Sequence, residues 1–382
     1  MVGLGDIARG EGLQYLQTHF AAPVQRKALR DIAQCRTAAL GTVANTCDDC
    51  GDEYRLFCSC RNRSCPLCQG EAQRKWLEAR EQEILPVPYL HMVFTPPREL
   101  KVLARFCPEV AYSALIRAAG QAIVDVGRSK LHLRLGSLVE LHTWDQNMGF
   151  HPHAHCAVPS GGFSEDGTRW VPFEPHDLPR KALGNRFRSL MCKSIEKAKR
   201  RGRLSRLPAT LSVEQLLAKV KGCQWKVYVQ PPSGGTQGLL EYLARYTYRV
   251  AITNERIESY EDHEVTFRRR GDGQAIEHAW CTLDAQEFLR RFLMHVPPKG
   301  FVRIRSYGFL GNHKRKQNIE RARQLIGDVS TPEVRERFTP LRLCPACAAK
   351  RGLSTSHFAP SPEVTPQYDL QLRPPPNEPL AA

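Results

Sequence analysis

Three histidines stand at every second position in one short run of the chain, at His151, His153 and His155. If this run is a β-strand, all three side chains project from one face, because successive residues of a strand point to opposite faces. Two imidazoles on one face can share a divalent metal ion and leave other positions open for water and phosphate. A lone histidine would more simply be a core or surface residue, but the alternating group predicts a metal site.

A third ligand is expected from the strand that precedes the histidines. Residues 138–146 and the histidine run are separated by a turn around residues 149–150, which predicts a hairpin. Directly opposed residues share a face, and this register sets Gln146 opposite His153, so that its neutral oxygen would join the histidines. A shift of one residue in register would offer Asp145 instead.

A pair of tyrosines follows further along the chain, at Tyr242 and Tyr246. Residues 238–250 show apolar side chains at helical spacing, and the two tyrosines, four residues apart, share the opposite side with Arg245 and Arg249. A phenol can attack a phosphodiester while arginines hold the phosphate. On its own, the pattern is also typical of surface tyrosines. In a chain that also has a predicted metal site, it indicates that the tyrosines are nucleophiles.

Two Cys-x-x-Cys pairs occupy the N-terminal part of the chain, Cys47 with Cys50 and Cys65 with Cys68. Two such pairs facing each other satisfy the tetrahedral coordination of zinc, and four thiolates leave no open position for catalysis. The sequence therefore predicts one structural zinc site made of these four residues.

Other cysteines leave the ligand set open. Cys35, Cys58 and Cys60 lie near the two pairs and are alternative ligands, in an exchanged or a second site. A third pair, Cys344 with Cys347, stands near the C-terminal end without an evident partner pair. A complete second zinc site would need two more ligands than this pair supplies.

The charge balance favours a polyanionic partner. The 382 residues include 55 Lys and Arg against 39 Asp and Glu, which gives a net charge of +16 and a pI near 9.4. A basic surface favours binding to DNA, because neutralising the phosphates releases counterions. Arg61 and Arg63 are candidate phosphate contacts, although a solvated basic loop would look the same, and Trp144 offers a face for base stacking.

The elements that must position these residues alternate between strand and helix patterns. Short β-rich runs bounded by turn residues are expected to form strands, and long basic or apolar stretches between them are expected to be helical. The strands are expected at 89–95, 138–146, 153–158, 225–230, 250–257, 265–270 and 301–307, and the main helices at 71–85, 100–131, 179–222, 238–250 and 285–295. Strands and helices are therefore both expected along the chain.

Taken together, the motifs resemble the HUH endonuclease superfamily and, within it, the two-tyrosine rolling-circle transposases of the insertion-sequence-ninety-one family. The resemblance covers residues 35 to about 320. The stretches that carry it are CRTAALG (35–41), SCRNRSCPLCQG (59–70), HMVFTPP (91–97), LHTWDQN (141–147), HPHAHC (151–156), YLARYTYRVAI (242–252) and FVRIRSYGFL (301–310).

The resemblance implies an α+β protein, with a zinc-binding, DNA-binding domain ahead of a catalytic domain that has a central antiparallel sheet flanked by helices. We expect these domains at residues 1–80 and 85–325, a basic segment with the third cysteine pair at 326–353, and a disordered Pro-rich tail at 354–382. Ser64 stands where the family pattern has a histidine, so cysteines alone are expected to bind the zinc.

The resemblance also implies the chemistry. His153 and His155 would bind Mg²⁺ or Mn²⁺, and Tyr242 or Tyr246 would cleave single-stranded element ends through a 5′-phosphotyrosine. Neither a membrane-length apolar run nor a secretory signal is visible, so we expect a cytoplasmic, nucleoid-associated bacterial protein. A replication initiator or relaxase would use the same chemistry, and a non-catalytic zinc-ribbon protein is the alternative of a different class.

Overall fold

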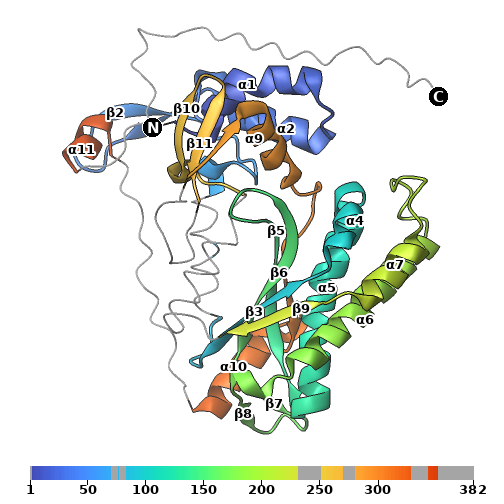
Figure 1. Ribbon diagram of the computed structural model, residues 1–382. Helices are drawn as coiled ribbons and strands as arrows, with labels where there is room; N and C mark the ends of the chain where they lie inside the picture. The colour runs from blue at the N-terminus through green and yellow to red at the C-terminus, as the bar shows by residue number, and fades with distance from the viewer. Residues whose placement is uncertain are drawn as a thin grey trace.

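A computed structural model of the chain describes residues 2–69, 76, 83–230, 251–269, 280–327 and 343–351. Its centre is a five-stranded sheet in the order β13-β5-β6-β3-β9, and every neighbouring pair is antiparallel (Figure 1). The strands are β3 (Tyr89–Thr95), β5 (Gly136–Trp144), β6 (Phe150–Pro159), β9 (Lys226–Gln230) and β13 (Ile304–Gly308). The α+β class expected from the sequence is confirmed.

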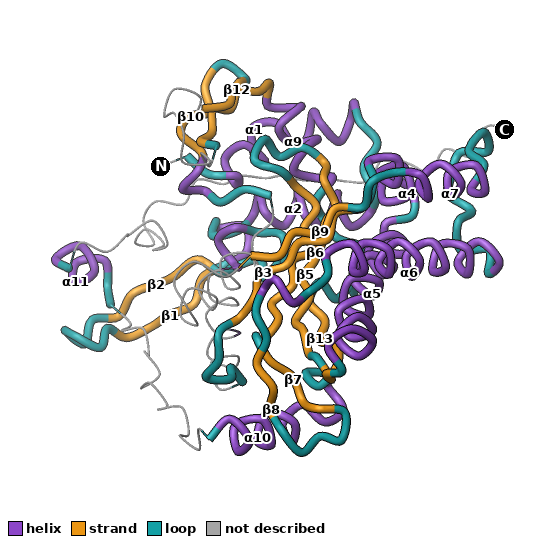
Figure 2. The backbone as a smooth tube through the Cα atoms, turned by 60° about the horizontal axis from the view of Figure 1, so that its bottom comes forward, coloured by secondary structure: helices purple, strands orange, loops and turns teal. Residues whose placement is uncertain are grey.

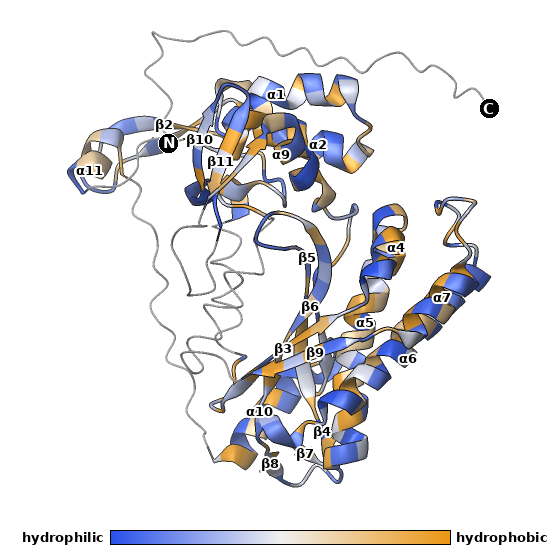
Figure 3. Cartoon of the chain, viewed as in Figure 1, coloured by the Kyte–Doolittle hydropathy of each residue, from blue (hydrophilic) through white to orange (hydrophobic). Residues whose placement is uncertain are grey.

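One face of this sheet is covered by helices. They are α4 (Lys101–Phe106), α5 (Pro108–Val126), α6 (Arg180–Arg200) and α7 (Val213–Gly222). Helix α5 lies against the strands and is largely apolar, whereas α6 alternates polar and apolar positions because it packs on α5 and exposes its outer side (Figure 3). Strand side chains such as Met92, Phe94 and Ala154 bury themselves in this core.

The other face of the sheet carries the polar side chains. Along β3, the residues alternate between buried and partly exposed, because neighbouring side chains point to opposite faces. The same alternation along β6 leaves His151, His153 and His155 partly exposed while Pro152 and Ala154 are buried. Hydrophobic burial on the helix side therefore fixes which residues face away from it.

A second core joins the N-terminal helices to residues 251–296. Helices α1 (Leu4–Thr18) and α2 (Pro23–Gln34) pack with the sheet β10 (Ile257–Glu261), β11 (Glu264–Arg268), β12 (Trp280–Asp284) and with α9 (Ala285–Met294). Leu4, Ile32, Phe267 and Phe288 are completely or almost completely buried there. Residues 251–296 thus share a core with residues 2–35.

Smaller elements surround these cores. The hairpin β1 (Thr42–Thr46) and β2 (Glu53–Phe57) extends with α11 (Pro345–Lys350) from the side of the molecule opposite α5, α6 and α7 (Figure 2). A third sheet contains β4 (Leu133–Arg134), β7 (Gly161–Ser164) and β8 (Trp170–Pro172), and α10 (Arg315–Ile326) lies beside it. Within the described ranges, no helix combines the length and the apolar character needed to span a bilayer.

Candidate metal and zinc centres

Three imidazoles meet on the open face of the central sheet. The nearest ring nitrogens of His142, His153 and His155 all lie within 4.8 Å of one another. His142 comes from β5 and stands directly opposite His153 of β6, while His155 is two residues further along the same strand. The predicted histidine strand is therefore present, and a third histidine completes the group.

The expected register of the hairpin is wrong. Its turn is longer than predicted, so that Gln146 lies in the turn and His142 takes the place opposite His153. An irregularity between His142 and Trp144 shifts the last pair, which sets Trp144 opposite Phe150. Gln146 still lines the cavity that contains the three histidines. A regular register counted from this five-residue turn would set Leu141 opposite His153, so the irregularity, and not the turn length alone, brings His142 to this place.

The three histidines are neutral and could therefore act as metal ligands. Burial lowers the pKa of His153 to about 4. Its Nδ1 donates to the His151 carbonyl at 2.6 Å, which leaves the Nε2 lone pair for a metal, because a carbonyl oxygen can only accept. Burial and the neighbouring histidines hold the pKa of His142 well below 6.5, and burial has the same effect on His155.

Two further side chains support this group from the same face. Nδ1 of His155 is 2.8 Å from Nε2 of His91, a β3 residue that the sequence analysis did not single out. Trp144 stacks on His142 with 4.8 Å between ring centroids, and the Arg303 guanidinium lies 5.7 Å from the Trp144 ring. Trp144, predicted as a DNA contact, is thus part of the wall of the site.

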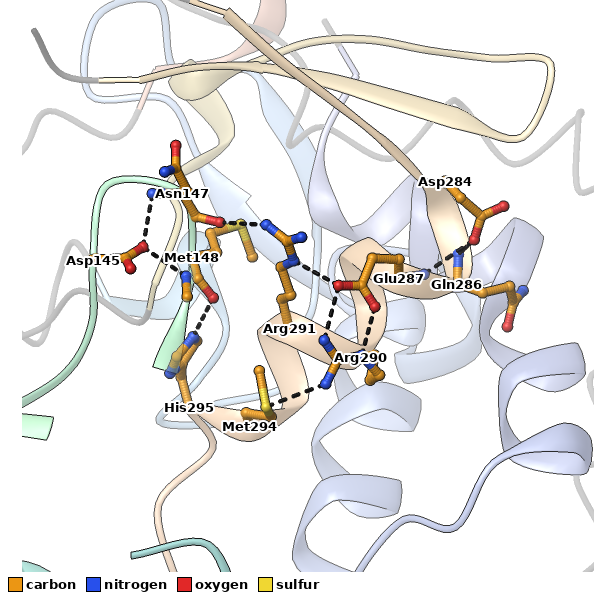
Figure 4. A network of polar contacts seen from close by, with 11 residues as sticks. Asp145, Asn147, Met148, Asp284, Gln286, Glu287, Arg290, Arg291, Met294 and His295 are labelled. Atoms are coloured by element: carbon orange, nitrogen blue, oxygen red, sulfur yellow. Dashed lines mark hydrogen bonds and ion pairs between the residues drawn. The ribbon is translucent and has the colours of Figure 1, made fainter. Parts of the chain in front are cut away.

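Helix α9 holds the turn that ends the histidine hairpin (Figure 4). Arg291 donates to the Asn147 carbonyl at 3.0 Å, and Nε2 of His295 donates to the Met148 carbonyl at 2.9 Å. The Asp145 carboxylate accepts two backbone N–H groups of the turn, at 2.7 and 2.9 Å. Asp145, an alternative ligand in the sequence analysis, is therefore engaged in shaping the turn.

The histidines open into a cavity of about 280 Å³. Part of its wall is formed by Ala251, Ile252, Thr253 and Arg256. Ala251 has a φ of +49°, a left-handed conformation that is unusual for a residue with a side chain. The predicted nucleophile segment ends immediately before this wall, and its four candidate residues, Tyr242, Arg245, Tyr246 and Arg249, lie outside the described residues.

Four cysteines form a cluster beside helix α2. The sulfur atoms of Cys35, Cys60, Cys65 and Cys68 lie within 4.8 Å of one another, with Cys35 and Cys60 at 3.5 and 3.6 Å from Cys68. Tetrahedral zinc with Zn–S bonds of about 2.3 Å requires sulfur separations of about 3.8 Å. Ser64 is buried beside these thiols and is not one of the grouped ligands.

The other early pair belongs to a different cluster. Cys47 and Cys50 lie with Cys344 and Cys347, again within 4.8 Å. The single site expected from Cys47, Cys50, Cys65 and Cys68 is therefore not what the structure builds. The reason is the hairpin: Cys47 and Cys50 sit in its turn, about 17 Å along the strands from its base.

The remaining candidate contacts occupy different environments. Nη2 of Arg63 donates to the Phe301 carbonyl at 2.6 Å, which fastens the cysteine loop to the segment before β13. Arg61 is exposed in the same loop, with a φ of +52°. At the opposite edge of the central sheet, a basic cleft of about 540 Å³ runs along β9, lined by residues that include Arg180, Lys181 and Lys226.

Comparisons with known proteins agree with this architecture. A family described as "Putative transposase" matches residues 136–318, and one described as "Transposase zinc-binding domain" matches residues 7–96. The chain is 40% identical over 371 residues to "Putative transposase y4qJ" of Sinorhizobium fredii (strain NBRC 101917 / NGR234), covering 90% of this chain and 92% of the relative. It is 26% identical over 282 residues to "Transposase for insertion sequence element IS801" of Pseudomonas savastanoi pv. phaseolicola, covering 73% and 68%.

These matches cover both the histidine hairpin and the first cysteine cluster. A transposase acts on DNA, and the positive net charge of the chain suits that partner. The chain belongs to the two-tyrosine transposases of the insertion-sequence-ninety-one family and carries their N-terminal zinc-binding domain.

Proposed function

We propose that this transposase cleaves and rejoins single-stranded DNA at the ends of its element through a 5′-phosphotyrosine, during rolling-circle transposition. The observation that carries the proposal is the cavity lined by the three histidines and by Ala251, the residue that directly follows the two-tyrosine segment. A metal-binding group and the continuation of the candidate nucleophile segment thus border one space.

Three nitrogen ligands suit Mn²⁺ better than Mg²⁺. The stronger argument for a catalytic cation is that the site is open to a cavity, where a phosphate could reach it. His142, His153 and His155 would hold the cation as neutral nitrogen donors, and Mn²⁺ accepts imidazole more readily than Mg²⁺ does. A closed tetrahedral cage is absent from this described group, because three ligands face a cavity of about 280 Å³. When bound there, such a cation would polarise a non-bridging oxygen of the scissile phosphate.

Chain connectivity limits how far the tyrosines can lie from this site. A fully extended chain spans at most about 3.6 Å per residue, and Tyr246 precedes Ala251 by five residues. The Tyr246 backbone is therefore within about 18 Å of the cavity wall in any conformation. At the other end of the segment, Gln230 pairs with His91 on the histidine face, so both ends of residues 231–250 adjoin the site.

The covalent step is a transesterification. The phenol oxygen of Tyr242 or Tyr246 would bond to phosphorus and lose its proton to solvent, while the bond from phosphorus to the 3′ oxygen breaks and that oxygen takes up a proton. Arg245 and Arg249 would neutralise the charge that develops on the phosphate. The phosphotyrosine keeps the free energy of the diester, so rejoining needs no ATP, and the second tyrosine permits a second cleavage.

The open sheet face supports a path for a single strand. Tyr228 is opposite Val93, and Val93 is opposite His155, so all three side chains share one face. Two strand spacings separate Tyr228 from His155, which is about 10 Å. Tyr228 is 50% exposed beside the basic cleft, and bases of a single strand can stack on such a ring.

Covalent trapping tests the proposal. The full chain is incubated with Mn²⁺ and with a 3′-labelled oligonucleotide that carries an element end, because the fragment held by a 5′-phosphotyrosine retains the 3′ end. Protein-linked label is then measured on a denaturing gel. Tyr242→Phe combined with Tyr246→Phe should abolish the linkage while binding of the oligonucleotide stays nearly unchanged. Tyr248→Phe is the matched control, because this third tyrosine of the same segment is expected to point elsewhere.

The same assay separates substrate forms. We expect cleavage of the single strand and little cleavage of the fully paired linear duplex, since the second strand would obstruct access to the phosphate. Full linkage in the double variant would contradict the tyrosine assignment, and equal cleavage of both forms would contradict the preference for single strands.

A further inference from the structure

Four thiols from opposite ends of the chain meet beside the β1–β2 hairpin. Cys47 and Cys50 lie in the hairpin turn, and Cys344 and Cys347 lie at and within α11. The sulfur atoms of Cys50 and Cys344 are 3.6 Å apart, although 294 residues separate them along the chain. The match to the family's zinc-binding domain ends at residue 96 and does not include the second pair.

The sulfur positions suit a tetrahedral ion and not a disulfide. A disulfide bond would require about 2.05 Å between the sulfur atoms, whereas four thiolates around zinc are about 3.8 Å apart. All four sulfur atoms of this cluster lie within 4.8 Å of one another, and the Cys50–Cys344 separation is close to the tetrahedral value. The first cluster contains four other thiols, those of Cys35, Cys60, Cys65 and Cys68. Each cluster therefore has four ligands of its own, as a tetrahedral zinc ion requires.

The backbone around the thiols has the form of two facing turns. The Cys344 N–H donates to Sγ of Cys47 at 3.2 Å, which ties one pair to the other. The Gly51 N–H closes the first turn on the Cys47 carbonyl at 3.0 Å, and Gly51 adopts a φ of +78°, which suits a residue without a side chain. Pro345 begins the helix that carries Cys347.

The few apolar side chains around this cluster cannot by themselves stabilise the contact between the hairpin turn and α11. Apart from the cysteines, its described apolar members are Tyr54, Leu56, Leu343 and Ala348. Helix α11 has six residues, and an isolated helix of that length is unstable in water. One ion pair, Arg351 with Asp49 at 2.9 Å, joins the two parts, and an exposed pair of this kind contributes little.

We propose that Cys47, Cys50, Cys344 and Cys347 bind a second, structural zinc ion that fastens the C-terminal segment to the N-terminal hairpin. Binding requires the four thiols to be deprotonated, and the released protons pass to solvent. The zinc replaces the missing hydrophobic core as the source of order for α11. The zinc-binding domain of this transposase is then completed by a segment from the other end of the chain.

Metal counting on the full chain tests the proposal. Elemental mass spectrometry of the purified protein should find two zinc ions per chain. Cys344→Ser combined with Cys347→Ser should leave one, and Cys47→Ser combined with Cys50→Ser should also leave one. Cys58→Ser is the matched control, because Cys58 directly follows β2 and belongs to neither cluster, and it should keep two.

Two further measurements separate metal binding from a folding defect. Cys344→His combined with Cys347→His should keep two metal ions, because imidazole also binds zinc, and should shift the visible absorption of the cobalt-substituted protein. Amide exchange in residues 343–351 should rise in the Cys47→Ser, Cys50→Ser variant, although both substitutions lie at the other end of the chain.

A mixing experiment distinguishes a site within one chain from a site between two chains. When the two serine double variants are combined, the metal content should stay at one zinc per chain. A rise above one upon mixing would overturn the proposal of a site within one chain. One zinc in the unmodified protein, or two zinc ions in either serine double variant, would overturn the second site itself.

Discussion

Nε2 of His91 lies 2.8 Å from Nδ1 of His155, and their rings are stacked with 5.0 Å between centroids and 3° between planes. If His155 offers its Nε2 to a metal, its Nδ1 carries the proton and donates it to His91. A partner of this kind fixes the tautomer and the orientation of a metal-binding histidine. His91 is thus a positioning residue, supplied by β3 and not by the histidine hairpin.

Replacing the acceptor should weaken metal binding. His91→Phe keeps a stacked ring but cannot accept the proton of His155, so we expect the affinity for Mn²⁺ to fall by about 10- to 100-fold. His91→Gln keeps an acceptor oxygen and should lose less. Isothermal titration of the full chain measures both, with Thr95→Val on the same strand and face as the control. An unchanged affinity in His91→Phe would contradict this role.

The observed register allows a direct test of which residue, His142 or Gln146, is the third metal ligand. His142→Ala should abolish metal-dependent cleavage and lower Mn²⁺ affinity strongly, because it removes one of three grouped nitrogens. Gln146→Ala should retain the binding of metal, since Gln146 lies in the turn. The measurements are metal titration and the covalent-trapping assay. A larger loss of affinity in Gln146→Ala than in His142→Ala would restore the register expected from the sequence.

The exposed ring on β9 should contribute to binding of a single strand. Tyr228→Ala should lower the affinity for a labelled oligonucleotide by about tenfold, since stacking of a base on an aromatic side chain contributes roughly 1–3 kcal/mol. Tyr228→Phe should bind almost as the original chain does. Fluorescence anisotropy measures the affinity, and Phe20→Ala, which removes an aromatic side chain that is 90% exposed on another part of the surface, is the control. Equal binding by Tyr228→Ala would place the strand elsewhere.

His295 should make the fold sensitive to mild acid. Burial lowers its pKa from 6.5 to about 4, against the opposing effects of the Met148 carbonyl and Asp145. Above pH 6.5 the residue is neutral in both the folded and the unfolded chain. Between pH 6.5 and 4 only the unfolded chain takes up the proton, so the free energy of unfolding falls as the pH falls.

The difference between these two pKa values corresponds to on the order of 3 kcal/mol of stability lost by pH 4. His295→Gln can still donate to Met148 and accept from Thr143, and it should lose less stability than the original chain over this window. Denaturant unfolding at several pH values gives the comparison, and His313→Gln at an exposed position is the control. If the free energy of unfolding changed with pH in the same way for the original chain and for His295→Gln, burial would not lower the pKa of His295.

Local spacing was sufficient for several features of this protein. The alternation of His151, His153 and His155 predicted a strand with its imidazoles on one face, because period two is a property of any strand. The Cys-x-x-Cys pairs were recognisable for a similar reason, since each pair forms its turn from adjacent residues. The α+β class was implied by the family that these motifs resemble.

Tertiary structure decided which residues meet. The register of β5 on β6 depends on the length of the turn and on the contacts that α9 makes with it, so His142 and not Gln146 completes the histidine group. His91 enters the site because β3 pairs with β6, which no local pattern reports. These contacts join residues distant in sequence, and their free energy depends on the packed fold.

The cysteines show the same division. The chain by itself determined that thiols come in pairs, but the rigid β1–β2 hairpin carries Cys47 and Cys50 away from Cys65 and Cys68. Cys344 and Cys347 reach them only because residues 343–351 return to that hairpin after 294 residues. Pairing within a turn is local and therefore readable from spacing, whereas the choice of partner pair is set by where the folded chain brings its ends together.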